Sequence, residues 1–405
     1  MSKEEIPRRE LFRRAAMIGA GLGVAGSTLA ASTATAQEAE TPLLESVPRR
    51  ELGSTGESIP ILLFGGDGTF DPQYDRMLHR GFRLGMNYLD TAESYANGQS
   101  HKTLGVFVEQ VGRENLWITS KSGLFQRKAT PEMYLKAIEE NIADLRTDYL
   151  DMFFMHGVKD LGDLEPEFIK MGQDMKKRGF TKFFGFSCHD GNVVELMNKA
   201  AKIGSAGIDA VMFKYSFAMY GDLELNKAID ACTSAGIGLI GMKAQDSTLQ
   251  DLDEVKKFQS ENFTLGQAKL KAVWADERIS GCTSGMTNMK LLRENSDAAR
   301  SVTQLAIGEF MQLNRYAART ADTRCKFCSH ICESHIDGNT RVAQALRYLM
   351  YDECYGEHEK ARAMYRALRP DERDIRHVDL DRATGACPQG INIRKRLELA
   401  HSRLA

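Results

Sequence analysis

Four polar residues lie at the ends of three successive segments that read as buried strands. Asp90 and Tyr95 belong to "NYLDTAESY", Lys121 ends "LWITSK" and His156 ends "LDMFFMH". A buried ammonium beside a phenol favours the ionised phenol and lowers its pKa, which makes the phenol a usable general acid. A carboxylate can hold the ammonium, and an imidazole can orient a substrate oxygen. These residue types predict proton donation to a carbonyl, with Tyr95 as the donor.

The elements that must position these residues alternate in type. Short apolar segments typical of buried parallel strands are separated by amphipathic segments with helical period, one of which opens at Thr130 and Pro131. The expected strands are 61–66, 87–90, 116–121, 149–156, 183–188, 210–216, 238–244 and 279–284. Eight such units in about 260 residues predict an α/β fold, a (β/α)8 TIM barrel, preceded by a short hairpin from Arg49. Such barrels keep their chemistry at the carboxyl ends of the strands, where all four residues fall.

Four stretches of this region together resemble the aldo-keto reductase family. They read "LGSTGESIPILLFGG", "DTAESYANGQSHKTLG", "RGFTKFFGFSCHD" and "GIGLIGMKAQ". The resemblance extends roughly from Arg49 to Arg315 and includes the four residues above as the catalytic set. It implies an oxidoreductase that interconverts a carbonyl and an alcohol by hydride transfer on a small-molecule substrate.

The same resemblance implies a nicotinamide cofactor, NADP(H) or NAD(H), held across the top of the barrel. The family's Ser-Asn pair on strand five appears as Ser187-Cys188, and its nicotinamide-contacting Gln appears as Met212. The adenosine phosphate would lie in "SGMTNMKLLREN", where Gly285 replaces a common Lys and Leu291 a common Arg. We therefore expect a weakened site with little preference between the two nucleotides. The implied cofactor positions are Ser187, Cys188, Met212, Gly285, Met286, Glu294 and Asn295.

Five of the eight cysteines lie in a charged, helical tail that follows the barrel. Thiolates in a run such as "CKFCSHIC", with a later Cys-Pro, are typical ligands of a [4Fe–4S] cluster. The expected ligands are Cys325, Cys328, Cys332 and Cys387, and the alternates are Cys354, His330 and His335. Through "RYLMYDECYGEHEKARAMY" and "CPQGINIRKRLELAHSRL" the tail also resembles the iron–sulfur-containing branch of the family. Zinc and disulfide bonds are the alternatives for these sulfurs. The other cysteines, Cys188, Cys232 and Cys282, are expected in the barrel core.

Residues 1–36 resemble a twin-arginine signal peptide. The pair Arg8-Arg9 precedes a Gly/Ala-rich run over 15–31, and "ATA" at 34–36 offers a cleavage site. The run of about 17 residues is too short and weakly apolar for a permanent span, so we expect no membrane span in the mature chain. The prediction is a periplasmic protein that is exported by the twin-arginine machinery. A short membrane anchor or a disordered basic tail is the alternative.

The overall balance of charge argues against a nucleic-acid partner, because the formal net charge of the 405-residue chain is −2. The expected organisation is a signal peptide over 1–36, a polar linker over 37–48, the barrel over 49–316 and the helical [4Fe–4S] domain over 317–405. Delivery of electrons through a cluster would imply an electron-transfer partner. A second functional class also fits the sequence, namely a non-catalytic redox sensor or regulatory module on the same barrel.

Overall fold

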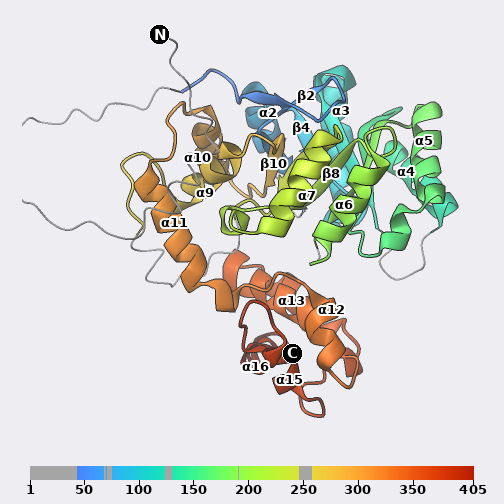
Figure 1. Cartoon of the computed structure of the whole chain (residues 1–405). Helices are drawn as coiled ribbons and strands as arrows, with labels where there is room; N and C mark the ends of the chain where they lie inside the picture. Colours follow the sequence, from blue (N-terminus) through green and yellow to red (C-terminus); the bar gives the residue numbers. More distant parts are fainter. Residues whose placement is uncertain (1–42, 68–69, 71–74, 124–129, 190, 246–257) are drawn as a thin grey trace, which may run out of the picture.

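The structure is a computed structural model that describes residues 43–67, 70, 75–123, 130–189, 191–245 and 258–405. Figure 1 shows a barrel with a helical tail beneath it. The expected signal peptide, 1–36, and the linker residues 37–42 lie outside the described residues. Within the described ranges, no helix has the length and apolar character needed to cross a membrane.

Eight parallel strands close into a barrel, which confirms the fold expected from the sequence. β10 pairs with both β9 and β3, and the other strands pair in chain order. The strands are β3 (Leu62–Gly65), β4 (Tyr88–Asp90), β5 (Trp117–Ser122), β6 (Leu150–Met155), β7 (Thr181–Cys188), β8 (Ala210–Lys214), β9 (Gly238–Met242) and β10 (Gly281–Ser284). Because all eight run in one direction, their carboxyl ends meet at one face of the barrel.

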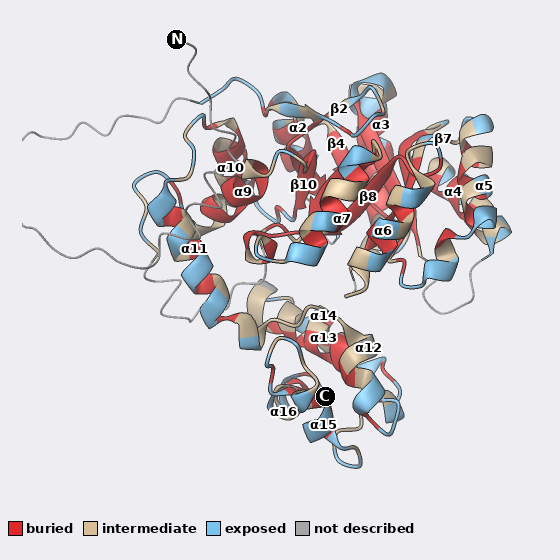
Figure 2. Ribbon diagram, viewed as in Figure 1, coloured by how far each residue is buried: buried red, intermediate tan, exposed pale blue. Residues whose placement is uncertain are grey.

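Helices surround the barrel and bury the outer faces of the strands. They are α2 (Asp75–Arg83), α3 (Gln99–Val111), α4 (Pro131–Asp144), α5 (Pro166–Lys177), α6 (Val193–Ile203), α7 (Leu223–Ser234), α9 (Leu265–Ala275) and α10 (Met289–Arg300). The expected opening of α4 is present, since the Thr130 side chain accepts a hydrogen bond from the Met133 amide and Pro131 is the first helical residue. In Figure 2 the strands are buried, and the helices expose their outer faces.

A hairpin closes the amino-terminal end of the barrel. Strands β1 (Arg49–Glu51) and β2 (Ser58–Pro60) pair antiparallel. The Ser54 amide donates to the Gly236 carbonyl at 2.8 Å, just before β9. Leu52 and Ile59 are fully buried and join the side chains that fill the barrel interior. With this end sealed, the opposite face is the one available for chemistry.

The tail has a hydrophobic core of its own. Its helices are α12 (Ser329–Cys332), α13 (Val342–Tyr355), α14 (His358–Arg366), α15 (Leu380–Gly385) and α16 (Ile393–Leu404). Leu349, Tyr365 and Leu397 are among the residues at the centre of that core. The boundary expected between residues 316 and 317 falls inside α11 (Ile307–Arg319), whose Leu313 packs with the barrel-side residue Phe217. The long helix α11 therefore connects the two bodies.

Candidate active site

The structure brings the four residues expected at the strand ends together at the carboxyl face of the barrel. Asp90 is the last residue of β4, Lys121 lies in β5 and His156 directly follows β6. Tyr95 lies on the short 3-10 turn η2 (Tyr95–Gly98) after β4. Because Asp90 aligns with Thr119 on β5, Lys121 lies two residues further along the same side of the sheet.

Lys121 and Asp90 form an ion pair that is almost fully removed from solvent. The Lys121 Nζ atom donates to Asp90 Oδ1 at 2.6 Å and to the Thr91 carbonyl at 2.8 Å. The exposed fractions of the two side chains are 1% and 5%. Burial lowers the pKa of Lys121 and raises that of Asp90, and the attraction between the two charges opposes both shifts.

Tyr95 is held beside this pair by an unusual turn. The next three residues, Ala96, Asn97 and Gly98, have φ of 49°, 54° and 82°. Consecutive left-handed residues are costly for Ala and occur where the surrounding structure imposes them, often at functional sites. The Lys121 Nζ atom lies 4.8 Å from the centre of the Tyr95 ring. The His156 ring lies 5.7 Å from the Tyr95 ring, edge to face.

The pKa of Tyr95 differs from the sequence expectation. Burial raises the pKa of the phenol well above its ordinary value, and the nearby carboxylates of Asp90 and Asp67 add to the shift. The ammonium of Lys121 is close to the face of the ring, but its charge is compensated by Asp90. Desolvation therefore outweighs the lowering that an isolated ammonium would produce.

Burial favours the neutral form of two neighbouring histidines, His156 beside Tyr95 and His189 beside His156. Burial, helped by the positive charges of Lys121 and Arg347, lowers the pKa of His156 to about 3. His189 follows β7 and its ring centre lies 6.3 Å from that of His156. Burial also lowers the pKa of His189 well below its usual value. A neutral imidazole keeps one N–H donor and one acceptor, so both rings can bind an uncharged oxygen.

His189 and the tail residue Arg347 were not expected from the sequence. His189 is the residue after Ser187-Cys188 in "GFSCHD", so its position in an already noted motif was a usable signal. Arg347 lies on α13, far along the chain, and its influence on His156 arises only from the packing of the tail on the barrel.

The cofactor positions expected on the strands are buried in the upper part of the barrel. Ser187 and Met212 align on neighbouring strands β7 and β8. The Ser187 hydroxyl accepts a hydrogen bond from the Gly157 amide at 2.9 Å. Cys188 is fully buried, as are Cys232 and Cys282. Met212 belongs to the apolar interior of the barrel, so it can contact a ring but cannot replace the hydrogen bonds of an amide side chain.

The positions expected for the adenosine half lie after β10. Gly285 is exposed, and a Cβ atom at this position would meet no atom within 4 Å, whereas Met286 is fully buried. Asn295 on α10 is engaged within the protein, since it donates to Ser284 Oγ at 2.9 Å and accepts from Gln245 at 3.2 Å. Glu294 accepts a hydrogen bond from the Thr264 hydroxyl at the start of α9. Asn295 and Glu294 are therefore held in place by hydrogen bonds, whereas Gly285 is exposed and leaves free space beside it.

The four tail cysteines expected as cluster ligands lie near one another. Burial raises the pKa of Cys325 to about 11 and that of Cys332 to about 12, and the neighbouring thiols, including Cys328 and Cys387, contribute to both shifts. The Phe327 amide donates to Cys325 Sγ at 3.3 Å. In the described part of the chain, however, no three His, Cys, Asp or Glu side chains are arranged to hold a metal ion. Four cysteine sulfurs are the ligand type of an iron–sulfur cluster. In the described residues, however, their positions do not form a metal-binding group.

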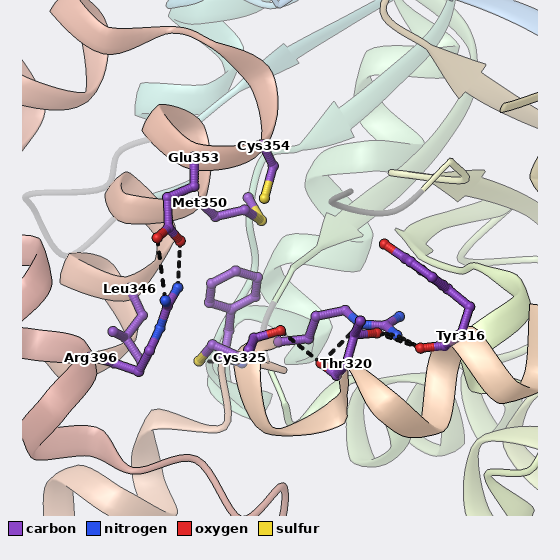
Figure 3. Close-up of a pocket in the computed structure, with 11 residues that line it drawn as sticks. Tyr316, Thr320, Cys325, Leu346, Met350, Glu353, Cys354 and Arg396 are labelled. Carbon is purple, nitrogen blue, oxygen red and sulfur yellow. Dashed lines mark hydrogen bonds and ion pairs between the residues drawn. The ribbon is translucent and has the colours of Figure 1, made fainter. Parts of the chain in front are cut away.

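A pocket adjoins this cysteine loop, between α11 and α13. Figure 3 shows Cys325 on one side and Cys354 on the helix above, with Met350 between them. The Arg396 guanidinium binds both carboxylate oxygens of Glu353, at 3.3 and 2.6 Å, and closes another side. Cys354 therefore points into the pocket from α13, apart from the "CKFCSHIC" loop.

Comparison with known proteins agrees with this architecture. The model of the aldo/keto reductase family matches residues 62–319. L-galactose dehydrogenase from Arabidopsis thaliana is 23% identical over 297 residues, which cover 66% of this chain and 92% of that protein. An uncharacterized oxidoreductase from Bacillus subtilis is 22% identical over 282 residues, covering 62% and 91% of the two chains.

Solved structures share the same barrel. The holo form of an aldo-keto reductase from Bacillus halodurans superposes with a TM-score of 0.56 at 20% identity, over 66% of this chain and 96% of that chain. An aldo-keto reductase from Klebsiella pneumoniae in complex with NADPH gives a TM-score of 0.54 at 20% identity, over 65% and 93%. The family match extends from the first barrel strand to the end of α11, and the chain therefore belongs to the aldo/keto reductase family and is an oxidoreductase.

Proposed function

We propose that this protein interconverts a carbonyl and an alcohol on a small molecule, with Tyr95 as the general acid and base. The observation that carries the proposal is the convergence of Tyr95, the buried Lys121–Asp90 pair and a neutral His156 at the carboxyl face of the barrel. A purely structural arrangement would gain little from burying an ion pair beside a phenol, because desolvation offsets most of the attraction.

In the direction of reduction, a bound nicotinamide supplies the hydride that the carbonyl carbon receives. Tyr95 donates its phenolic proton to the carbonyl oxygen, and its raised pKa keeps that proton in place across the neutral range. His156 is uncharged and orients the same oxygen through a ring N–H. Lys121 stabilises the phenolate that remains, Asp90 holds Lys121, and solvent returns the proton to Tyr95.

The proposed cofactor is NADP(H) or NAD(H). Support comes from the NADPH held by the Klebsiella pneumoniae relative and from Asn295, which donates a hydrogen bond to Ser284, the residue before Gly285. Neither Gly285 nor Leu291 can offer a positive charge to the adenosine phosphate. We expect the dissociation constants of NADPH and NADH, measured by fluorescence titration, to differ by less than about 100-fold.

Leu291→Arg should tighten NADPH binding about 10- to 100-fold and leave NADH unchanged, because a charge-assisted hydrogen bond contributes roughly 1.5–3 kcal/mol. A wild-type preference for NADPH well beyond the expected range would mean that Lys290 or Arg293 already binds the phosphate. Lys290→Gln and Arg293→Gln would then identify the residue responsible.

We further propose that Cys325, Cys328, Cys332 and Cys387 hold a [4Fe–4S] cluster. The run "CKFCSHIC" with "CPQG" supports this. Anaerobically purified protein should be brown and contain about four irons and four sulfides per chain. Cys387→Ser should lose the iron, while Cys354→Ser, the matched control outside the run, should keep it. Colourless protein with stoichiometric zinc would contradict the cluster.

Export by the twin-arginine route is proposed on the sequence of residues 1–36. Replacing Arg8 and Arg9 together by Lys should retain the protein in the cytoplasm, as measured by fractionation and by the molecular mass of the chain. Replacing Arg13 and Arg14 by Lys is the matched control and should leave export unchanged. Equal export of both variants would exclude this signal.

The function itself is tested by turnover. Anaerobically purified protein should oxidise NADPH or NADH when supplied with a panel of aldehydes, ketones and sugars. Sugars belong in the panel because one relative carries the name of a sugar dehydrogenase. Tight nucleotide binding without turnover of any carbonyl would favour the non-catalytic sensor on the same barrel.

A further inference from the structure

The tail lies directly under the carboxyl face of the barrel and touches several of its loops (Figure 1). The Lys360 Nζ atom on α14 lies 3.2 Å from both carboxylate oxygens of Asp67, which follows β3. The Gly191 amide after β7 donates to the Phe327 carbonyl at 3.3 Å. Lys326 reaches Asp222 at 3.9 Å, after β8. Contacts with three strand–helix loops place α14 and the cysteine loop at the mouth of the site.

Three cations surround the Phe327 ring at this mouth, namely Lys214 and Lys243 from the barrel and Arg347 from the tail. Lys243 follows β9 with a left-handed φ of 56°, and its Nζ atom lies 5.3 Å from the centre of the Phe327 ring and 5.8 Å from that of Tyr351. The Arg347 guanidinium, from α13, lies 4.7 Å from the same Phe327 ring. Phe327 is almost fully buried, and the three cations lie 4.7 to 5.3 Å from the centre of its ring.

These cations lie close to the proposed catalytic residues. The charge of Arg347 acts on His156, and the charges of Lys243 and Arg347 both act on His189, where each lowers the pKa of the imidazole. Tyr351, one helical turn beyond Arg347 on α13, influences Tyr95. The tail therefore contributes a positive charge, that of Arg347, near both imidazoles.

His189 supplies an independent sign of a ligand. Its Nδ1 atom is removed from solvent and has no hydrogen-bond partner among the described residues. Burying a polar nitrogen without a partner costs roughly 1–3 kcal/mol, so such atoms usually mark a position that a ligand or water completes. Since the His189 ring is 6.3 Å from that of His156, this position adjoins the one proposed for the carbonyl.

We propose that the tail completes the substrate site, with Arg347 and Lys243 as specificity-determining residues for a carbonyl compound that carries a nearby carboxylate or phosphate. The inference rests on the proposed function. The carbonyl oxygen meets Tyr95 and His156, the anionic group binds Arg347 and Lys243, and His189 hydrogen-bonds an oxygen between them. A planar guanidinium suits carboxylate and phosphate alike, so either group satisfies the geometry.

The test compares two matched pairs of aldehydes, succinic semialdehyde with butanal and glycolaldehyde phosphate with glycolaldehyde. The wild-type protein should favour the anionic member of at least one pair by more than about 10-fold in kcat/KM, the value of one charge-assisted hydrogen bond. The pair that shows the larger preference identifies carboxylate or phosphate as the anion.

Arg347→Gln should lower kcat/KM for that anionic aldehyde by about 10- to 100-fold, mainly through KM, and by a much larger factor than for its neutral partner. Arg347→Lys should recover part of the loss. Arg341→Gln is the matched control. Arg341 lies at the start of the same helix and pairs with Glu333 and Glu372, so the variant removes one cation away from the proposed site. An equal loss of kcat/KM for the anionic aldehyde in Arg341→Gln would mean that the effect depends only on the net charge of the protein, and it would overturn the proposal.

Binding without turnover separates this inference from the proposed function. Succinate and inorganic phosphate should bind the wild-type protein, by calorimetry, about 10-fold or more tightly than they bind Arg347→Gln. That result would support the anion site even if no aldehyde were reduced. Equal turnover of neutral and anionic aldehydes would overturn the inference while leaving the proposed function intact. Absence of both anion binding and anion preference would likewise overturn it.

Discussion

The environment of Tyr95 is dominated by the buried pair beneath it. Lys121 and Asp90 are 1% and 5% exposed, and their charges largely cancel at the phenol. Burial then keeps the pKa of Tyr95 above its ordinary value, so the phenol stays protonated at neutral pH. In the proposed reaction, the ammonium acts on the phenolate formed after proton transfer.

Asp90→Asn should destabilise the protein strongly. The substitution leaves the Lys121 ammonium buried with an amide in place of its carboxylate, and breaking a buried pair costs about 3–5 kcal/mol. Urea unfolding, followed by circular dichroism, measures the change in the free energy of unfolding.

The double variant Asp90→Asn/Lys121→Met removes both charges, and it should be more stable than Asp90→Asn alone. If Asp90→Asn alone lowered the free energy of unfolding by less than about 1 kcal/mol, which is the contribution of an exposed ion pair, water would have to reach this pair.

At the scale of elements, the sequence predicted the strands well, because buried strands leave apolar runs in it. The strands of a parallel barrel are buried on both faces, so continuous apolar runs such as "MFFM" in β6 could be recognised. The ends of those strands then placed Asp90, Lys121 and His156 on one face. Tyr95, just beyond the end of β4, was expected from the same pattern. Its left-handed turn was not, because Ala96 does not favour positive φ, although Asn97 and Gly98 do.

The contact between the barrel and the cysteine loop depends on a missing side chain at Gly191. A Cβ atom there would lie 2.4 Å from Cys328 Cβ and 2.5 Å from Cys328 Cα. Gly191→Ala should therefore push the loop away from the barrel, which hydrogen exchange would detect as faster exchange over 325–332.

Gly221→Ala is the matched control for this prediction. Gly221 lies after β8, and a Cβ atom at this position would meet nothing within 4 Å. Unchanged exchange in Gly191→Ala would show that the loop does not depend on this close approach.

At the scale of the whole molecule, the tail is more than an appendage on the family barrel. It brings Arg347, Tyr351 and Phe327 to the mouth of the site, and none of these could be predicted from the sequence as site residues. Their role depends on how the tail packs on the barrel, and local sequence patterns do not predict that packing. The expected boundary at 316/317 lies within α11, which runs through it as one continuous helix.

The molecule should lose stability in mild acid because it buries neutral histidines. Burial lowers the pKa of His101 to about 4 and that of His156 to about 3. Below the unfolded value of about 6.5 the unfolded chain binds more protons than the folded chain, so stability falls as the pH decreases from there toward the folded values. The thermal midpoint should therefore be lower at about pH 5 than at about pH 7.5.

His101→Gln can keep the hydrogen bond to Ser120 without titrating, so its midpoint should depend less on pH than that of the wild type. The exposed His377 provides the control, and His377→Gln should behave as the wild type does. An identical acid dependence in all three proteins would assign the effect to the carboxylates.

The central claim is that Tyr95 donates the proton in carbonyl reduction, and Tyr95→Phe tests it most directly. The variant keeps the ring beside Lys121 and removes only the hydroxyl group. On the best carbonyl substrate of the wild-type protein, kcat should fall by about 10²–10⁴-fold, while the dissociation constant of the nucleotide is unchanged. Tyr149→Phe, just before β6 at the closed end of the barrel, should retain full activity. Near-full activity of Tyr95→Phe on that substrate would contradict the account.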